Sequence, residues 1–211
     1  MRETSGQFID LSAWKRRDHF ELFRAAAHPF FSVTVNVDVT RIWERPSAPG
    51  RSFSLAALYA LLCAANASGP LRLRLRGDRV WRHDCVGVGT TVLRSDETFS
   101  FARVDPAPTF EDFCKVSTPA IQRAKAPAPL EPMLDADDLI YHSSLPWLRF
   151  TSFTNALHGT DSIPRVVFGK VFADGPAFRM PVGVEVHHAL VDGLDVARFI
   201  DAFEREVASL E

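Results

Sequence analysis

Hydrophobic and polar positions alternate most regularly between residues 31 and 40. Apolar side chains occupy every second place and polar ones fill the gaps: Phe31, Val33, Val35, Val37 and Val39 against Ser32, Thr34, Asn36, Asp38 and Thr40. A period of two predicts a half-buried strand. Val182, Val184 and Val186 repeat the pattern, so a second strand of this kind is expected near the C-terminal end.

Apolar residues spaced by three or four predict helices elsewhere in the chain. Residues 53–67 indicate a largely apolar helix that ends at Ser68-Gly69-Pro70, and another helix is expected over 110–124. Near the start, Asp10-Leu11-Ser12 is expected to cap a helix that runs toward Ala27 and stops before Pro29. The apolar face of a closing helix is marked by Val196, Ile200, Phe203, Val207 and Leu210.

Further strands are expected over residues 79–93 and 97–104, and in a region of strand pattern from 145 to 180 that includes 165–172. Leu71, Leu73 and Leu75 alternate with Arg72, Arg74 and Arg76, which indicates a strand with a solvated arginine face; phosphate binding is the alternative. Loops are expected at residues 46–50, 126–132 and 155–163. Strands mixed with four helices, without an internal repeat, predict a layered α/β domain.

Composition adds mainly exclusions. The 211 residues are 46% hydrophobic and 24% charged with a net charge of −2, which predicts one soluble domain over 1–211 and argues against nucleic-acid binding. The longest apolar run, residues 55–65, is too short to cross a bilayer, and residues 1–5 lack a signal-peptide pattern, so a cytoplasmic location is expected. Three cysteines without a C-x-x-C pair predict neither a disulfide framework nor a zinc site, and no metal is expected.

Candidate chemistry gathers between the last predicted strand and the last predicted helix. There, residues 186–193 place His187 and His188 just before the turn Asp192-Gly193. Histidine titrates near neutrality and suits proton transfer. Such junctions are common places for reactive side chains, although a plain turn with a satisfied histidine is the other interpretation.

Several motifs in matching order give this chain a resemblance to the trimeric chloramphenicol acetyltransferases, from about Asp10 to Phe203. Residues 186–193 resemble the family's His-His-x-x-x-Asp-Gly signature, and residues 14–20 its Trp-x-Arg-x-x-His-Phe pattern. Residues 143–147 with 150–153 are similar to its Ser-x-x-Pro-Trp and Thr-Ser-Phe segments, and Phe168-Gly169-Lys170 to its Gly-Lys strand. The wider superfamily includes the acyltransferase cores of 2-oxo acid dehydrogenase complexes and peptide-synthetase condensation domains, whose accessory regions or second half are missing here.

The resemblance implies a two-layer α/β sandwich, a mixed sheet with helices packed on it, as in CoA-dependent acyltransferases. It implies that His188 is the general base, with His187 as its neighbour, for direct transfer of an acetyl group from acetyl-CoA to a hydroxyl of chloramphenicol. Ser143 then stabilises the oxyanion and also touches the cosubstrate. Asp192 is implied to pair with Arg16 in a buried ion pair that holds the active-site loop, instead of acting in a catalytic triad.

The resemblance also implies which residues bind coenzyme A and the acceptor around that centre. Lys170 is expected near the phosphate end of coenzyme A, and an apolar acceptor pocket is expected from Phe23, Phe31, Phe99 and Phe153, for which ordinary core packing is the alternative. A homotrimer with sites between subunits is implied, and with it the antibiotic resistance that such enzymes confer.

Two departures from the family pattern leave other functions open. Val167 stands where the family has a threonine that supports the oxyanion through water, and Pro29-Phe30 stand where members carry smaller or polar residues. The alternatives are an acyltransferase that acts on another hydroxyl or amino acceptor, and a non-catalytic homologue that sequesters an aromatic ligand.

Overall fold

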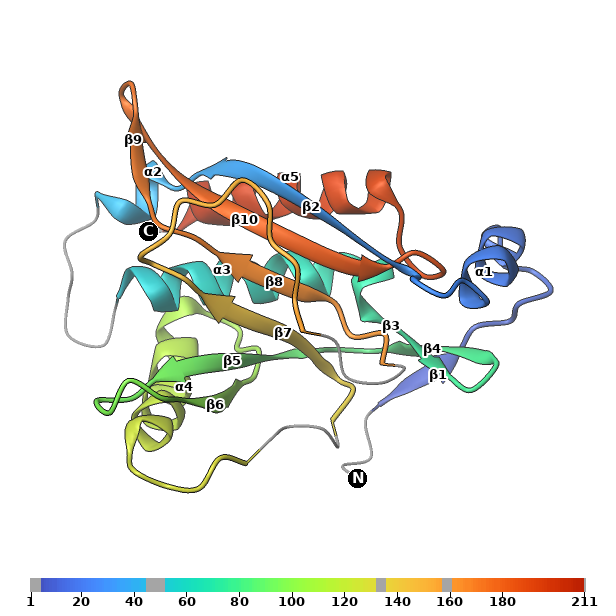
Figure 1. Cartoon of the computed structure of the whole chain (residues 1–211), viewed down its shortest axis with the longest axis horizontal. Coiled ribbons are helices and arrows are strands. Elements are labelled where there is room, and N and C mark those ends of the chain that lie inside the picture. Colours follow the sequence, from blue (N-terminus) through green and yellow to red (C-terminus); the bar gives the residue numbers. More distant parts are fainter. Residues whose placement is uncertain (1–4, 45–51, 132–135, 157–160, 211) are drawn as a thin grey trace.

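The computed structural model describes residues 5–44, 52–131, 136–156 and 161–210. Its main sheet has the strand order β2-β10-β8-β7-β5-β6, with β9 beside β10 (Figure 1). Strand β7 runs parallel to β5 and β8, and the other pairs are antiparallel, so the sheet is mixed as expected. The strands are β2 (Phe30–Asp38), β5 (Gly87–Leu93), β6 (Phe99–Val104), β7 (Leu139–Ser144), β8 (Arg165–Phe168), β9 (Phe172–Asp174) and β10 (Ala177–His187).

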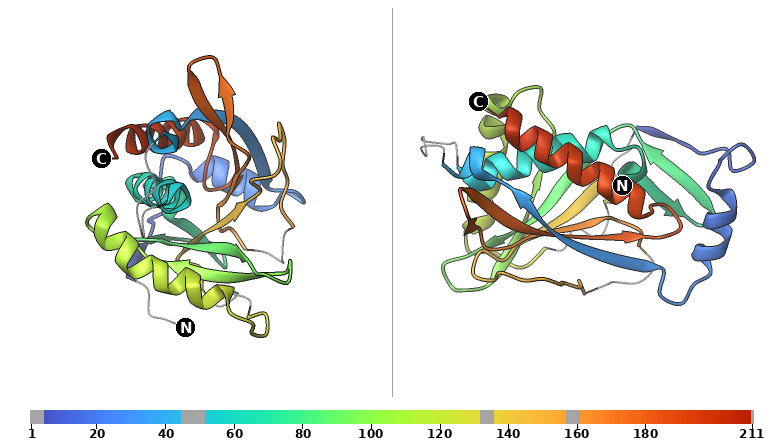
Figure 2. Two further views of the ribbon diagram at one scale, coloured as in Figure 1. Left: turned by 90° about the vertical axis from the view of Figure 1, so that its left-hand side faces the viewer. Right: turned by 90° about the horizontal axis from the view of Figure 1, so that it is seen from above.

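Three long helices cover one face of this sheet, which gives the expected two layers (Figure 2). They are α3 (Phe53–Ala67), α4 (Phe110–Lys125) and α5 (Gly193–Ser209), and α3 lies between the other two. Apolar residues surround α3 on all sides because it is covered by the sheet and by both neighbouring helices. No helix among the described residues is long and apolar enough to cross a membrane.

The regular elements predicted from periodicity are confirmed with small shifts. Strand β2 starts one residue earlier than predicted, and the short helix α2 (Thr40–Trp43) takes over its last position. Helix α3 has the predicted bounds, with the Ser52 hydroxyl accepting the Leu55 N–H at 3.2 Å. The strand pattern predicted from residue 145 begins only at β8, and Gly169-Lys170 separate β8 from β9. The predicted loop at 46–50 lies outside the described residues.

The predicted N-terminal helix is shorter than expected. Helix α1 covers Arg17–Arg24, because the Asp10 carboxylate accepts the backbone N–H and the hydroxyl of Ser12 at 2.9 and 2.6 Å. These bonds close a local turn instead of capping a helix. Residues 9–16 therefore form turns and irregular backbone before α1, and Arg16 at the end of this segment reaches the start of α5.

A small second sheet contains the arginine-rich segment. Its order is β1-β4-β3, with β1 (Gly6–Phe8), β3 (Leu73–Arg76) and β4 (Arg79–His83). The expected solvated arginine face is wrong at its centre, because Arg74 is only 1% exposed. Its guanidinium donates to the carbonyls of Leu71, Leu73, Asp137 and Leu139 at 2.5 to 2.9 Å. Burial lowers the pKa of Arg74 to about 10, and nearby carboxylates, Asp137 first, oppose that shift.

Candidate active site

The turn between β10 and α5 presents the paired histidines. The carbonyl of His187 accepts the N–H groups of Leu190 and Val191 at 2.9 and 3.1 Å, which folds the chain back. Asp192 then caps α5: its carboxylate accepts the N–H of Asp195 at 3.1 Å, and the Asp195 carboxylate accepts the N–H of Asp192 at 3.1 Å. This reciprocal capping box starts the helix, so Asp192-Gly193 is more than a simple turn.

The imidazole of His188 is held in one orientation by aromatic rings and by a backbone carbonyl. Its ring stacks on Phe23 of α1 with 3.9 Å between centroids and lies 4.7 Å from the ring of Phe31 on β2. Its Nδ1 is 3.2 Å from the carbonyl oxygen of Val191. A carbonyl only accepts, so this contact assigns the proton to Nδ1 and leaves the Nε2 lone pair as a base.

Arg16 joins the N-terminal segment to this turn. Its guanidinium forms an ion pair with the Asp192 carboxylate and donates to the carbonyl of His188 at 3.3 Å. Burial favours a higher pKa for Asp192, but the Asp195 N–H and Arg16 outweigh it and lower that pKa. The carboxylate therefore braces the turn, while Nδ1 of His188 bonds to Val191. The pair is less buried than expected, because the Asp192 side chain is 38% exposed, against 11% for Arg16.

Removing the charge of Asp192 tests this brace. Asp192→Asn keeps a good helix cap but loses the ion pair, so we expect the free energy of unfolding to fall by about 2 kcal/mol. Acyl transfer should fall with it, because the turn loses its anchor, and Arg16→Val should act alike. Urea unfolding and activity are measured together, with the exposed Asp201→Asn on the same helix as control. Normal stability with abolished activity in Asp192→Asn would refute a bracing role.

A second set of candidate residues lines a cavity on the face of the sheet without helices. Ser143 of β7, Phe99 of β6 and Phe153 border this cavity of about 720 Å³. His142, next to Ser143 on β7, also borders the cavity, while its ring packs on Phe168, which in turn packs on Phe203 of α5. Phe99 is 50% exposed, so its ring is available to a ligand instead of filling the core.

Within one chain, Ser143 and His188 are far apart. Ser143 is in register with Val167 of β8, which is in register with Gly183 of β10. His188 lies five residues further along the chain, which corresponds to about 16 Å along the strand direction. The structure therefore divides the predicted site into two groups. One surrounds His188 (Arg16, Asp192, Phe23, Phe31), and the other surrounds Ser143 (Phe99, Phe153).

Lys170 lies with the second group, in the connection after β8. It is exposed, and its N–H donates to the carbonyl of Leu148 at 2.8 Å. Trp147 and Leu148 beside it are 60% and 56% exposed, unusually open for large apolar side chains. In the sequence Trp147 stands out only as part of a motif, because its exposure is a property of the folded chain.

Two buried histidines predict a loss of stability in acid. Burial lowers the pKa of His187 to about 4 and that of His142 to about 3. Between pH 6.5 and 4 these histidines are protonated in the unfolded chain but stay neutral in the folded protein. The free energy of unfolding therefore falls as pH falls, by about 1.4 kcal/mol per pH unit for each group. Urea unfolding from pH 7 to 4.5 measures this slope. It should become shallower in His142→Leu but not in the exposed control His28→Leu; equal slopes in all three would contradict the assignment.

Comparison with solved structures identifies the class of protein. The chain is similar to a solved chloramphenicol acetyltransferase with a TM-score of 0.86 and 28% identity, over 96% of this chain and 100% of that one. A probable dihydrolipoamide acetyltransferase from Listeria monocytogenes 4b F2365 shares the fold, with a TM-score of 0.66 and 10% identity, over 92% of this chain and 90% of that one. The fold is thus that of the CoA-dependent acyltransferases.

Sequence comparison then gives the family. The family model for chloramphenicol acetyltransferase matches residues 5–204. Chloramphenicol acetyltransferase 3 of Escherichia coli is 30% identical over 200 residues, covering 93% of this chain and 94% of that protein. The chain belongs to the chloramphenicol acetyltransferase family and is an acyltransferase. The relative from Clostridium perfringens is 28% identical over 206 residues, 95% of this chain and 98% of its own length.

Proposed function

We propose that this protein is an O-acetyltransferase that moves an acetyl group from acetyl-CoA to a hydroxyl of chloramphenicol. The observation that carries the proposal is the Nδ1 contact of His188 with the Val191 carbonyl, which in the neutral imidazole places the proton on Nδ1 and leaves the lone pair of Nε2 for use as a base. The family supports the two substrates, since the similar proteins are chloramphenicol acetyltransferases. A cytoplasmic location and a single domain over residues 1–211 remain predictions from the sequence.

The reaction follows from two side chains. Nε2 of His188 accepts the acceptor's hydroxyl proton while the hydroxyl oxygen attacks the thioester carbonyl. The Ser143 hydroxyl donates to the oxyanion of the tetrahedral intermediate. As the carbonyl re-forms, the C–S bond breaks, and the departing thiolate of coenzyme A takes the proton from Nε2 of His188. No covalent enzyme intermediate is needed, because both substrates are bound together.

We propose that the two residues come from neighbouring subunits of a homotrimer. The separation of about 16 Å within a chain is too long for one residue to act on the acceptor hydroxyl while the other acts on the thioester carbonyl that this hydroxyl attacks. In a cyclic trimer, the His188 group of one subunit faces the Ser143 cavity of the next. The rings of Phe23 and Phe31 beside His188 then close the acceptor pocket from one side, with Phe99 and Phe153 on the other. Lys170 attracts the phosphates of coenzyme A.

Mixing two inactive variants tests this arrangement. His188→Ala and Ser143→Ala, refolded together in equal amounts, should regain about one quarter of the wild-type activity, because that share of random interfaces holds both intact residues. Free thiol released from acetyl-CoA in the presence of chloramphenicol is the readout. His188→Ala mixed with the double variant His188→Ala/Ser143→Ala is the control and should stay inactive. Mixed trimers without activity would show that the two residues do not share a site across subunits.

Two observations favour a second candidate, the same chemistry on another hydroxyl or amino acceptor. Val167 is in register with Ser143 and 1% exposed, so it offers neither a hydroxyl nor room for a water at this position. Phe30 lies edge-on to His187 with 5.1 Å between centroids, which makes the region next to the active-site turn aromatic. Thiol release that needs an acceptor other than chloramphenicol, and that is lost in His188→Ala, would support this alternative.

A further inference from the structure

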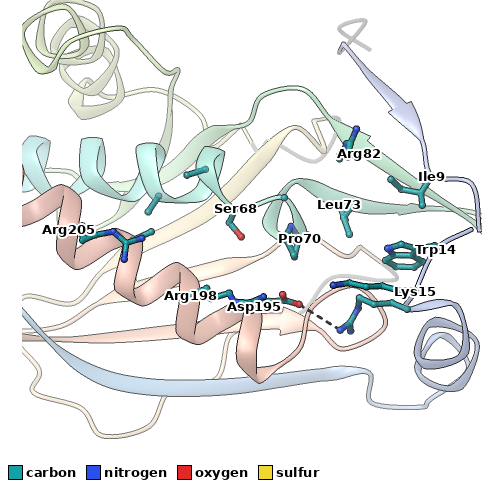
Figure 3. Close-up of a pocket in the computed structure, with 15 residues that line it drawn as sticks. Ile9, Trp14, Lys15, Ser68, Pro70, Leu73, Arg82, Asp195, Arg198 and Arg205 are labelled. Carbon is teal, nitrogen blue, oxygen red and sulfur yellow. Dashed lines mark ion pairs between the residues drawn. The ribbon is translucent and has the colours of Figure 1, made fainter.

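A separate cavity lies between the N-terminal segment, the end of α3 and the outer face of α5 (Figure 3). Its volume is about 610 Å³, within the size range of small-molecule sites. It shares no lining residue with the Ser143 cavity. The proposed acyl transfer makes no use of it.

Positive charge is concentrated on its walls. Lys15, Arg82, Arg198 and Arg205 line it, and none of them forms an ion pair with another residue of the described part of the chain. Arg198 and Arg205 are seven residues apart on α5, so they share one helix face about 10 Å apart. The carboxylate among the lining residues, that of Asp195, already accepts the Asp192 N–H and lies 3.7 Å from Arg16. The cavity therefore has an excess of unpaired cations.

The opposite wall carries apolar side chains, with Arg82 beside them. Figure 3 shows Ile9, Trp14 and Leu73 together across the cavity from Arg198 and Arg205, with Pro70 between the two sides. Trp14 is half-buried, and its indole offers a flat surface to a planar group. A ligand that fits both walls carries a negative charge at one end and a flat apolar body at the other.

One of the residues that line the cavity has a buried donor without a partner. Arg16 also lines this cavity, and its Nε is buried without a hydrogen-bond partner in the described residues. The same guanidinium uses Nη1 and Nη2 on Asp192 and on the carbonyl of His188. A buried donor without an acceptor is costly, so an anion bound here would satisfy it.

We propose that this cavity binds a phosphate ester of a planar apolar group, such as an aryl phosphate or a nucleoside monophosphate. The phosphate lies among Lys15, Arg198 and the Arg16 Nε–H, and the planar group lies on Trp14. Charge-assisted bonds from several cations favour a phosphate dianion over a carboxylate. The proposal is independent of which acceptor the active site acetylates.

Phenyl phosphate and AMP are the probes, titrated by calorimetry into the full-length protein saturated with coenzyme A and into the variant Lys170→Ala. Both should bind saturably in each case, and added salt should weaken them. Arg198→Gln/Arg205→Gln should raise the dissociation constants at least about tenfold, because charge-assisted bonds are lost. Arg123→Gln/Lys125→Gln, the same charge change at the exposed end of α4, should leave the affinity unchanged.

Three results would overturn the proposal. Displacement of the probes by coenzyme A would place them in the cosubstrate site. Equal affinity for inorganic phosphate would show that the wall of Ile9, Trp14 and Leu73 is not used. Equal weakening by both double variants would reduce the binding to general charge attraction. Trp14→Phe adds a local check, since ligand-induced quenching of tryptophan fluorescence should decrease in it.

Discussion

Replacing His188 with alanine is expected to lower kcat/KM for acetyl transfer by about 10³-fold, a typical contribution of a positioned general base. The imidazole is oriented by the Val191 carbonyl and by the rings of Phe23 and Phe31, so Nε2 is presented in a defined direction. Alanine removes the base, and a water molecule in its place is not held in the same orientation to accept the proton. Release of free thiol from acetyl-CoA in the presence of the acceptor measures the loss.

The control separates catalysis from folding. His19→Ala removes an exposed imidazole from α1 and should keep nearly wild-type activity. The thermal unfolding midpoint of His188→Ala should drop only modestly, because the ring that it removes is partly exposed and its backbone N–H still donates to the carbonyl of Pro29. Activity within about tenfold of wild type in His188→Ala would contradict its assignment as the base.

Replacing Arg74 with methionine is expected to reduce the free energy of unfolding by about 3 kcal/mol or more, because the carbonyls that it bonds are left without donors. Two of these, on Asp137 and Leu139, lead into β7, so the side chain ties the small sheet to the main one. Methionine has a similar length but no donor. The urea midpoint and its slope measure the effect.

Activity should fall together with this stability. Arg74 lines the same cavity as Ser143, and a shift of β7 would move the oxyanion donor. Arg17→Met, at the exposed start of α1, is the matched control and should change the unfolding free energy by less than about 0.5 kcal/mol. Equal urea midpoints for the two variants would show that the four carbonyls find other donors.

Local periodicity predicted most of the regular structure. Strands β2 and β10 and helix α5 were predicted because each has a repeating apolar face, and helix α3 because a largely apolar segment ends at Ser68-Gly69-Pro70. Both signals depend only on residues near in sequence. The N-terminal helix was wrong at its start for an equally local reason. Asp10 is a residue type that commonly caps helices, yet its carboxylate closes a turn on Ser12. Helix caps and such turns use the same residue types, so the sequence does not distinguish them.

Burial at Arg74 could not be predicted from alternation. A leucine-arginine repeat is typical of a strand with one wet face, and here carbonyls from two segments of the chain converge on that face. Two of the acceptors, on Asp137 and Leu139, lie more than sixty residues away, so no local pattern signals them.

The amino-acid sequence alone was sufficient for the family, for the layered α/β architecture and for the placement of His188 and Asp192 at a strand-to-helix junction. These features follow from short motifs and from apolar residues that repeat every second position in strands or every third to fourth position in helices. Tertiary structure decided three others: the Nδ1 tautomer of His188, the arrival of Arg16 at Asp192 from 176 residues away, and the distance between His188 and Ser143. Each depends on strand order, register and turn geometry, which bring together groups that the chain keeps far apart.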